Sequence, residues 1–247
     1  ISLGTVPLLQ YTAKSGSGSV TLGTLPTGVS ADLIDDGAGL IYLNVTSLAQ
    51  PRWDATLSDV WDTTTFNWLN AGFPSTYSNG STTQFDDTVT GSTQGAVVLN
   101  STVTPISLTF DNSIAPYSIN GTGKISGTTG LTKKGFQSLT LNTANDYTGV
   151  TELQGGTTSI NSIANAGSPS SIGAATASAS NLVFSGGSLT YTGTAASTDR
   201  GFTLAAIDST LSTNADLTIS GQVAVSLANS NLIKTGTGNL IFNGAAP

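Results

Sequence analysis

Short apolar runs broken by glycine, asparagine or aspartate recur along the chain after residue 95. Within most runs apolar and polar residues alternate, and residues two apart on a β-strand point to the same face of a sheet. The pattern therefore predicts short strands at 96–99, 106–110, 139–141, 150–153, 182–184, 189–191, 217–219, 223–227 and 240–242.

Such short, closely spaced strands are typical of a sheet that coils on itself as a parallel β-helix. A three-sided coil needs about 20–25 residues, and successive coils stack about 4.8 Å apart. The sequence thus predicts an all-β solenoid with Gly- and Asn-rich turns, roughly ten coils and about 50 Å long. Helix-forming residues are scarce, so we expect almost no helix.

One phrase occurs twice in the chain. Residues 131–142 read LTKKGFQSLTLN, residues 232–243 read LIKTGTGNLIFN, and each copy follows an Ile-Ser-Gly step. Self-similarity over a long period is typical of stacked repeats rather than of a closed domain. The alternation within the copies predicts that the core of the repeat consists of Leu131, Leu139, Leu141, Leu232, Leu240 and Phe242.

The amino-acid composition argues against some classes of function. Charged residues make up only 9% of the chain and the net charge is −7, which argues against nucleic-acid binding because that requires clustered Lys and Arg. No apolar stretch approaches the length of a membrane-spanning helix. The absence of cysteine favours a protein exported by a bacterium, in which stray thiols would risk mispairing. We expect the chain to be a mature or excised piece, with any export signal upstream.

The residues around the first copy resemble a known family. The segments Leu131-Thr132-Lys133-Lys134-Gly135, Asn145-Asp146-Tyr147-Thr148-Gly149 and Gly155-Gly156 are similar to the autotransporter-associated β-strand repeat, also called the passenger-associated transport repeat. The second copy keeps the Leu, Lys and Gly positions. The first copy departs from the pattern at residues 136–138. The stretch from Trp61-Asp62 to Phe110-Asp111 is similar to the opening of long units in giant bacterial surface proteins that carry this motif.

The resemblance implies a right-handed parallel β-helix displayed outside the cell. It also suggests three parts: residues 1–48 as the end of a preceding solenoid unit, 49–94 as a Trp- and Asp-rich connecting segment, and 95–247 as a solenoid with two copies of the Leu-x-Lys-x-Gly motif. Proteins of this family serve as adhesins, fibres or stalks, and a minority carry enzymes.

The connecting segment holds all three tryptophans of the chain. One interpretation is that their rings plug or cap the end of a core. The other is that they stack on sugar rings, because flat apolar rings suit carbohydrate faces as well as cores. We expect the first interpretation, and the second makes Trp53, Trp61 and Trp68 the candidate glycan-stacking residues.

Residues suited to catalysis or metal binding are few. The chain has no His and no Cys, which removes the commonest general base, nucleophile–base pairs and structural zinc sites. A glycosidase needs two carboxylates across a cleft, whereas the Asp35-Asp36 and Asp86-Asp87 pairs fall in expected turns. Neither pair matches a recognised calcium loop. We therefore predict no catalytic residues, no metal and no cofactor.

Lys133 and Lys234 occupy the same position of the two copies. A charge on a solvated face discourages lateral aggregation of β-proteins, so we expect both side chains to lie in solvent. The function expected from these observations is a structural repeat of an extracellular bacterial fibre, stalk or adhesin, continued head to tail. Its partners would be copies of itself or adjacent repeats, and surface glycans are a further candidate. The alternative is a β-helix that binds or degrades polysaccharide.

Overall fold

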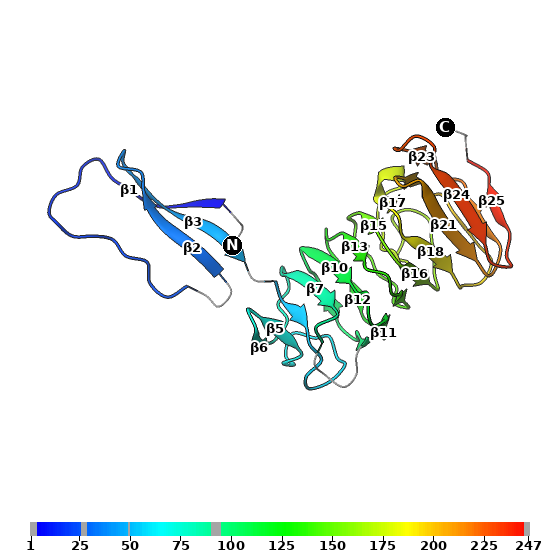
Figure 1. The fold of residues 1–247 in the computed structure, drawn as a ribbon, viewed down its shortest axis with the longest axis horizontal. Helices are drawn as coiled ribbons and strands as arrows, with labels where there is room; N and C mark the ends of the chain where they lie inside the picture. The colour runs from blue at the N-terminus through cyan, green and yellow to red at the C-terminus, as the bar shows by residue number, and fades with distance from the viewer. Residues whose placement is uncertain (1–3, 26–28, 49, 90–94, 245–247) are drawn as a thin grey trace. The chain divides into compact units, whose positions relative to one another are not determined.

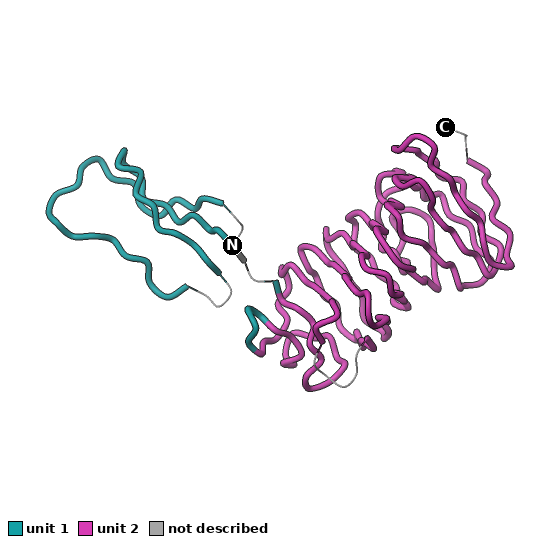
Figure 2. Tube along the Cα trace, viewed as in Figure 1, with its two compact units in different colours: residues 1–50, 70–73 teal, residues 51–69, 74–247 magenta. Residues whose placement is uncertain are grey.

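The computed structural model describes residues 4–25, 29–48, 50–89 and 95–244. The chain divides into two compact units (Figure 2): unit 1 contains residues 1–50 and 70–73, and unit 2 contains residues 51–69 and 74–247. In the described residues the one helical element is a 3-10 turn, η1 (Ala179–Asn181). No helix among them is long and apolar enough to cross a membrane.

Unit 1 is a three-stranded antiparallel sheet in the order β1-β3-β2. Its strands are β1 (Gly4–Gln10), β2 (Val29–Asp35) and β3 (Leu40–Leu48). The expected turn at Asp35-Asp36-Gly37 is present, with Gly37 at a φ of 68°, and it joins β2 to β3. In the described residues of this unit the strand pairing is antiparallel, and the assignment of residues 1–48 to the end of a preceding solenoid unit stays a prediction.

Unit 2 is a parallel β-solenoid of about seven coils (Figure 1), which confirms the predicted fold class. Its first face is a ten-stranded sheet in the order β23-β20-β17-β15-β13-β10-β7-β4-β5-β6. From one end to the other these strands are β23 (Val223–Val225), β20 (Phe202–Leu204), β17 (Leu182–Phe184), β15 (Thr151–Leu153), β13 (Leu131–Lys134), β10 (Ser107–Asp111), β7 (Thr82–Asp86), β4 (Arg52–Trp53), β5 (Trp68–Asn70) and β6 (Phe73–Ser75).

The second face is a seven-stranded sheet in the order β24-β21-β18-β16-β14-β11-β8. Its strands are β24 (Asn231–Thr235), β21 (Asp208–Thr213), β18 (Ser188–Tyr191), β16 (Thr157–Ile160), β14 (Leu139–Leu141), β11 (Tyr117–Asn120) and β8 (Ala96–Val98). The third side holds two shorter sheets: β12 (Lys124–Ile125) with β9 (Thr102–Val103), and β19 (Ala196–Thr198) with β22 (Leu217–Ile219) and β25 (Leu240–Phe242).

The solenoid starts earlier than expected. Strands β4 and β7 lie in the ten-stranded sheet, so these two strands of the expected connecting segment 49–94 pair with the solenoid. The count of about seven coils is lower than ten for two reasons. The first is that residues 1–50 lie in unit 1. The second is that the segment between β16 and β17 makes one coil longer than the others, since Thr151 of β15 has Leu182 of β17 as its partner in the next coil.

The two copies of the motif occupy different faces of the solenoid. In the first copy, β13 belongs to the ten-stranded sheet and β14 to the seven-stranded sheet. In the second copy, β24 belongs to the seven-stranded sheet and β25 to the third side. The motif therefore specifies a corner between two strands, and that corner can be placed at more than one position around a coil.

Candidate functional site

The three tryptophans form a buried cluster at the β4 end of the solenoid core. The exposed fractions of Trp53, Trp61 and Trp68 are 0%, 0% and 1%. Trp53 and Trp68 pair edge to face with ring centroids 5.1 Å apart, and Trp61 lies 5.1 Å from Phe85. None of these rings presents a face to solvent, so a sugar cannot stack on them as the structure stands. Their burial favours the first interpretation, in which the rings plug the end of the core.

The leucines of the first motif copy are fully buried, as their alternation predicts: Leu131, Leu139 and Leu141 have no exposed surface. Leu232 and Leu240 of the second copy are partly buried and pack against the same core. Phe242 is in register with the buried Ile219 and contacts the ring of Phe202, yet 46% of it is exposed. The exposure arises because no described coil covers β25.

Lys133 contradicts the expectation of a solvated face, because its exposed fraction is 0%. It lies between Phe110 and Leu153 in the register of the inward-facing residues. Its ammonium donates to the carbonyl oxygens of Lys134 and Gly135, the latter at 3.1 Å, and to that of Gly155 in the next coil at 3.4 Å. Burial lowers the pKa of Lys133 to about 8, although Asp111 and Asp87 raise it.

Lys234 makes the same corner contacts in the second copy. Its ammonium donates to Thr235 O at 2.5 Å and to Gly236 O at 3.1 Å. The glycines that follow the two lysines share a left-handed backbone, with φ of 71° at Gly135 and 79° at Gly236. Lys234 itself is exposed. The lysine of the motif therefore acts as a side-chain cap on the carbonyl groups of a glycine corner, and it is buried where a further coil lies over it.

Asp87 is a carboxylate of the solenoid that accepts hydrogen bonds from the neighbouring coil. Both oxygens of Asp87 accept from backbone N–H groups of the next coil, at Ser113, Ile114 and Ala115, over 2.7–3.3 Å. Burial by itself raises the pKa of Asp87, but the three N–H donors outweigh burial and hold that pKa below its usual value. Among the described residues no group of three or more Asp and Glu is arranged to hold a metal ion.

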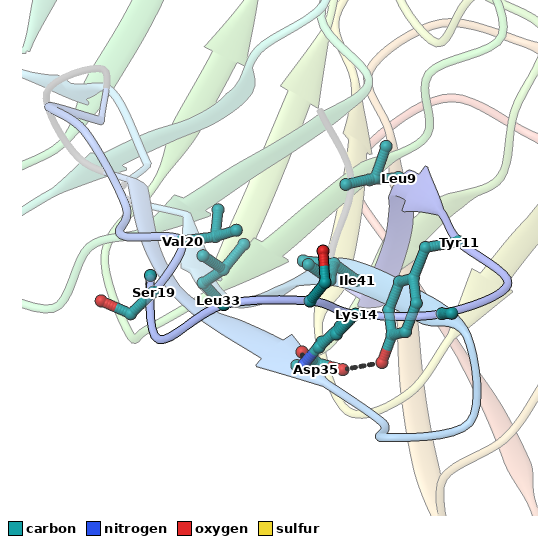
Figure 3. Close-up of a pocket in the computed structure, with 12 residues that line it drawn as sticks. Leu9, Tyr11, Lys14, Ser19, Val20, Leu33, Asp35 and Ile41 are labelled. Atoms are coloured by element: carbon teal, nitrogen blue, oxygen red, sulfur yellow. Dashed lines mark hydrogen bonds and ion pairs between the residues drawn. The ribbon is translucent and has the colours of Figure 1, made fainter.

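Unit 1 contains a pocket of about 570 Å³ between its sheet and the segment that follows β1. Strands β1 and β2 both pair antiparallel with β3. They therefore run in the same direction, and their last residues lie at the same end of the sheet. Tyr11, which follows β1, and Asp35, the last residue of β2, therefore meet at that end of the sheet (Figure 3). The Tyr11 N–H donates to Gly39 O at 2.8 Å, which fixes the end of β1 against the turn before β3.

One wall of the pocket is polar and internally neutralised. The Tyr11 hydroxyl donates to Asp35 Oδ1 at 2.7 Å, and the Gly37 N–H donates to the same oxygen at 3.0 Å. The Lys14 ammonium pairs with Asp35 Oδ2 and lies 5.1 Å from the centre of the Tyr11 ring. Apolar side chains lie beside this polar cluster (Figure 3) and belong to Leu9, Val20, Leu33 and Ile41. Leu9, Ile41 and Asp35 are in register across the three strands, so they share one face of the sheet.

Sequence reasoning missed this pocket. Tyr11 and Asp35 are 24 residues apart in the chain and come together only through the antiparallel pairing of unit 1. The feature of the sequence that could have indicated a pocket is the group of apolar residues on both sides of the Ser15-Gly16-Ser17-Gly18 segment. Two of them remain exposed in the structure, Leu9 at 53% and Val20 at 61%.

The comparisons with known proteins give one informative match. No family model matches the chain, and no solved structure matches it. The chain is 40% identical over 117 residues to the adhesin BmaC autotransporter of Brucella suis biovar 1 (strain 1330). The matched part covers 47% of this chain and only 3% of that protein's length. The match confirms the resemblance to autotransporter repeat proteins that the motif indicated.

Proposed function

We propose that this chain is part of an exported bacterial surface protein that acts in adhesion. The observation that carries the proposal is the 40% identity with a named autotransporter adhesin. The fold supports it, because stacked parallel coils build an extended surface in which each coil contacts only its neighbours. The adhesin name of the relative also favours a role other than catalysis.

We further propose that the solenoid is one repeat of a fibre or stalk in which coils continue head to tail. The support is the contrast between the last two described coils. Val225 is 53% exposed, whereas its partner in register one coil earlier, Leu204, is 4% exposed. Phe242 is 46% exposed, whereas its partner Ile219 is 4% exposed. An apolar cross-section and unpaired strand edges are the surface on which another coil would stack.

Attachment of whole bacteria tests the adhesive role. A strain that displays the full-length protein is compared with a strain whose copy lacks residues 51–247, and surface display of both forms is measured with an antibody to the remainder. We expect the deletion to reduce the number of bacteria attached to host cells or to a coated surface. Unchanged attachment at equal display would contradict the proposal.

A further inference from the structure

We propose that the pocket of unit 1 is a binding site for a neutral saccharide. The inference goes beyond the adhesive role and does not depend on fibre assembly. It rests on the chemistry of the lining, on the balance of charge in the pocket and on the space available.

The lining matches a ligand that has one apolar face and one hydroxylated edge. Leu9, Leu33 and Ile41 present aliphatic groups from the sheet, and Val20 presents one from the segment that follows β1 (Figure 3). Next to them, Tyr11, Lys14 and Asp35 bring a hydroxyl, an ammonium and a carboxylate to the end of the sheet. A pyranose ring has this division, with C–H groups on its face and hydroxyl groups around its rim. Ser15 and Ser19 add two hydroxyl groups to the lining, so polar and apolar residues both contribute to it, as such a ligand requires.

Charge selects a neutral sugar over an acidic one. The single ammonium of the pocket is paired with the single carboxylate that lines it, so an anionic ligand would have to compete with Asp35 for Lys14. The next carboxylate along the chain, Asp36, accepts from the N–H groups of Leu40 and Ala38, and these donors lower its pKa. The net charge of −7 on the chain adds to the repulsion of uronic and sialic acids.

The space suits more than one sugar ring. The pocket volume of about 570 Å³ lies within the range of small-ligand sites. A second hollow of about 280 Å³ shares Tyr11, Ala13 and Lys14 with it and extends over Gly37, Ala38 and Gly39. Residues Tyr11 and Lys14 therefore line both hollows, and a disaccharide could occupy the two.

Saturation-transfer NMR on the soluble chain tests the inference. The neutral probes are the methyl pyranosides of glucose, galactose and mannose, with lactose and maltose as disaccharides. The acidic probes are methyl glucuronide and N-acetylneuraminic acid. We expect transfer to the ring C–H protons of at least one neutral probe, and affinity for the acidic probes weaker by about tenfold or more, which is about 1.4 kcal/mol.

Three variants locate the binding. Tyr11→Ala removes the ring shared by the two hollows, and Val20→Arg fills the mouth from a position that is 61% exposed, so it spares the fold. Phe136→Ala is the matched control, because Phe136 is an 88% exposed aromatic residue of the solenoid. Loss of transfer in Val20→Arg with its retention in Phe136→Ala would support the inference. The inference is overturned if no neutral probe binds, if only acidic probes bind, or if Val20→Arg binds as the unmodified chain does.

Discussion

At the scale of single residues, the least expected feature is the buried ammonium of Lys133. Its position in the strand is consistent with burial, because Lys133 is two residues from the buried Leu131 and shares its face, but we expected a solvated side chain. The expectation of a solvated side chain followed from its charge instead, since Lys is almost never fully buried without partners. The partners are backbone carbonyls of a corner, which no single-strand pattern reveals.

Burial of Lys133 predicts a rise of stability with pH. The pKa is about 8 in the folded chain and 10.5 for an unperturbed lysine, so between these values the unfolded chain holds the proton and the folded chain releases it. Lys133 should therefore contribute a rise of about 2 kcal/mol to the free energy of unfolding between about pH 7 and 9.5. The buried tyrosines Tyr77, Tyr117 and Tyr147, whose pKa values are raised by burial, oppose this rise toward the upper end of the range. Urea unfolding at a series of pH values measures this change in the free energy of unfolding.

The variant Lys133→Met isolates the contribution of this residue to the pH dependence. It removes the titrating group while keeping an unbranched side chain of similar length in the core. The contribution of Lys133, which is the difference in pH dependence between the unmodified chain and Lys133→Met, should be about 2 kcal/mol over this range. An equal pH dependence in the variant and the unmodified chain would show that Lys133 is not the source.

The tryptophan plug predicts a stability loss rather than a binding loss. Because Trp61 is fully buried among Trp68, Tyr77 and Phe85, Trp61→Ala should lower the free energy of unfolding by about 3–5 kcal/mol. Phe66→Ala is the matched control, because Phe66 lies in the same segment and is 51% exposed. Similar small losses in both variants would argue against the plug.

At the scale of elements, the repeated motif builds a corner in which two coils approach closely. A Cβ atom on Gly135 would lie 2.2 Å from Asn112 O of the preceding coil, and the residue also has a φ of 71°. Gly135→Ala should therefore cost about 3 kcal/mol, from the left-handed backbone and from displacement of that carbonyl.

Gly80 offers a matched control for the close approach. Its φ is 82°, but no atom lies within 4 Å of a Cβ built on it, so Gly80→Ala should cost only about 1–2 kcal/mol for the backbone. Denaturant unfolding of the two variants gives the comparison. Equal losses would mean that the contact between coils at Gly135 contributes nothing.

The strands were predictable from sequence where apolar residues alternate. The boundaries of β14, β17, β22 and β25 agree with the expected ranges. The strand β16 was not predicted, because its sequence Thr157-Thr158-Ser159-Ile160 contains one aliphatic residue and buries the hydroxyl-bearing Thr158. The antiparallel sheet of unit 1 was also missed, since its pairing is not encoded in the spacing of apolar residues, and the pocket depends on that pairing.

At the scale of the whole molecule, the exposed apolar end of the solenoid makes a position-dependent prediction. In the isolated chain, Phe242→Asp should change the free energy of unfolding by less than about 1 kcal/mol, because the side chain is half exposed. Ile219→Asp, in register one coil earlier, should be severely destabilising because it buries an unpaired charge.

If coils continue over β25, the same Phe242→Asp change in the longer or assembled protein would bury the charge. We therefore expect it to sensitise the longer protein to protease while leaving the isolated chain resistant. Equal protease resistance of the longer protein with and without the change would contradict the stacking of a further coil on this end.

The central claim is that this solenoid forms part of an extended protein on the bacterial surface. Electron microscopy of the native full-length protein, labelled with an antibody against residues 95–244, tests it most directly. The account predicts long thin rods that carry the label outside the cell and that diffract with an axial spacing of about 4.8 Å. Compact isolated particles, or label confined to the cell interior, would contradict it.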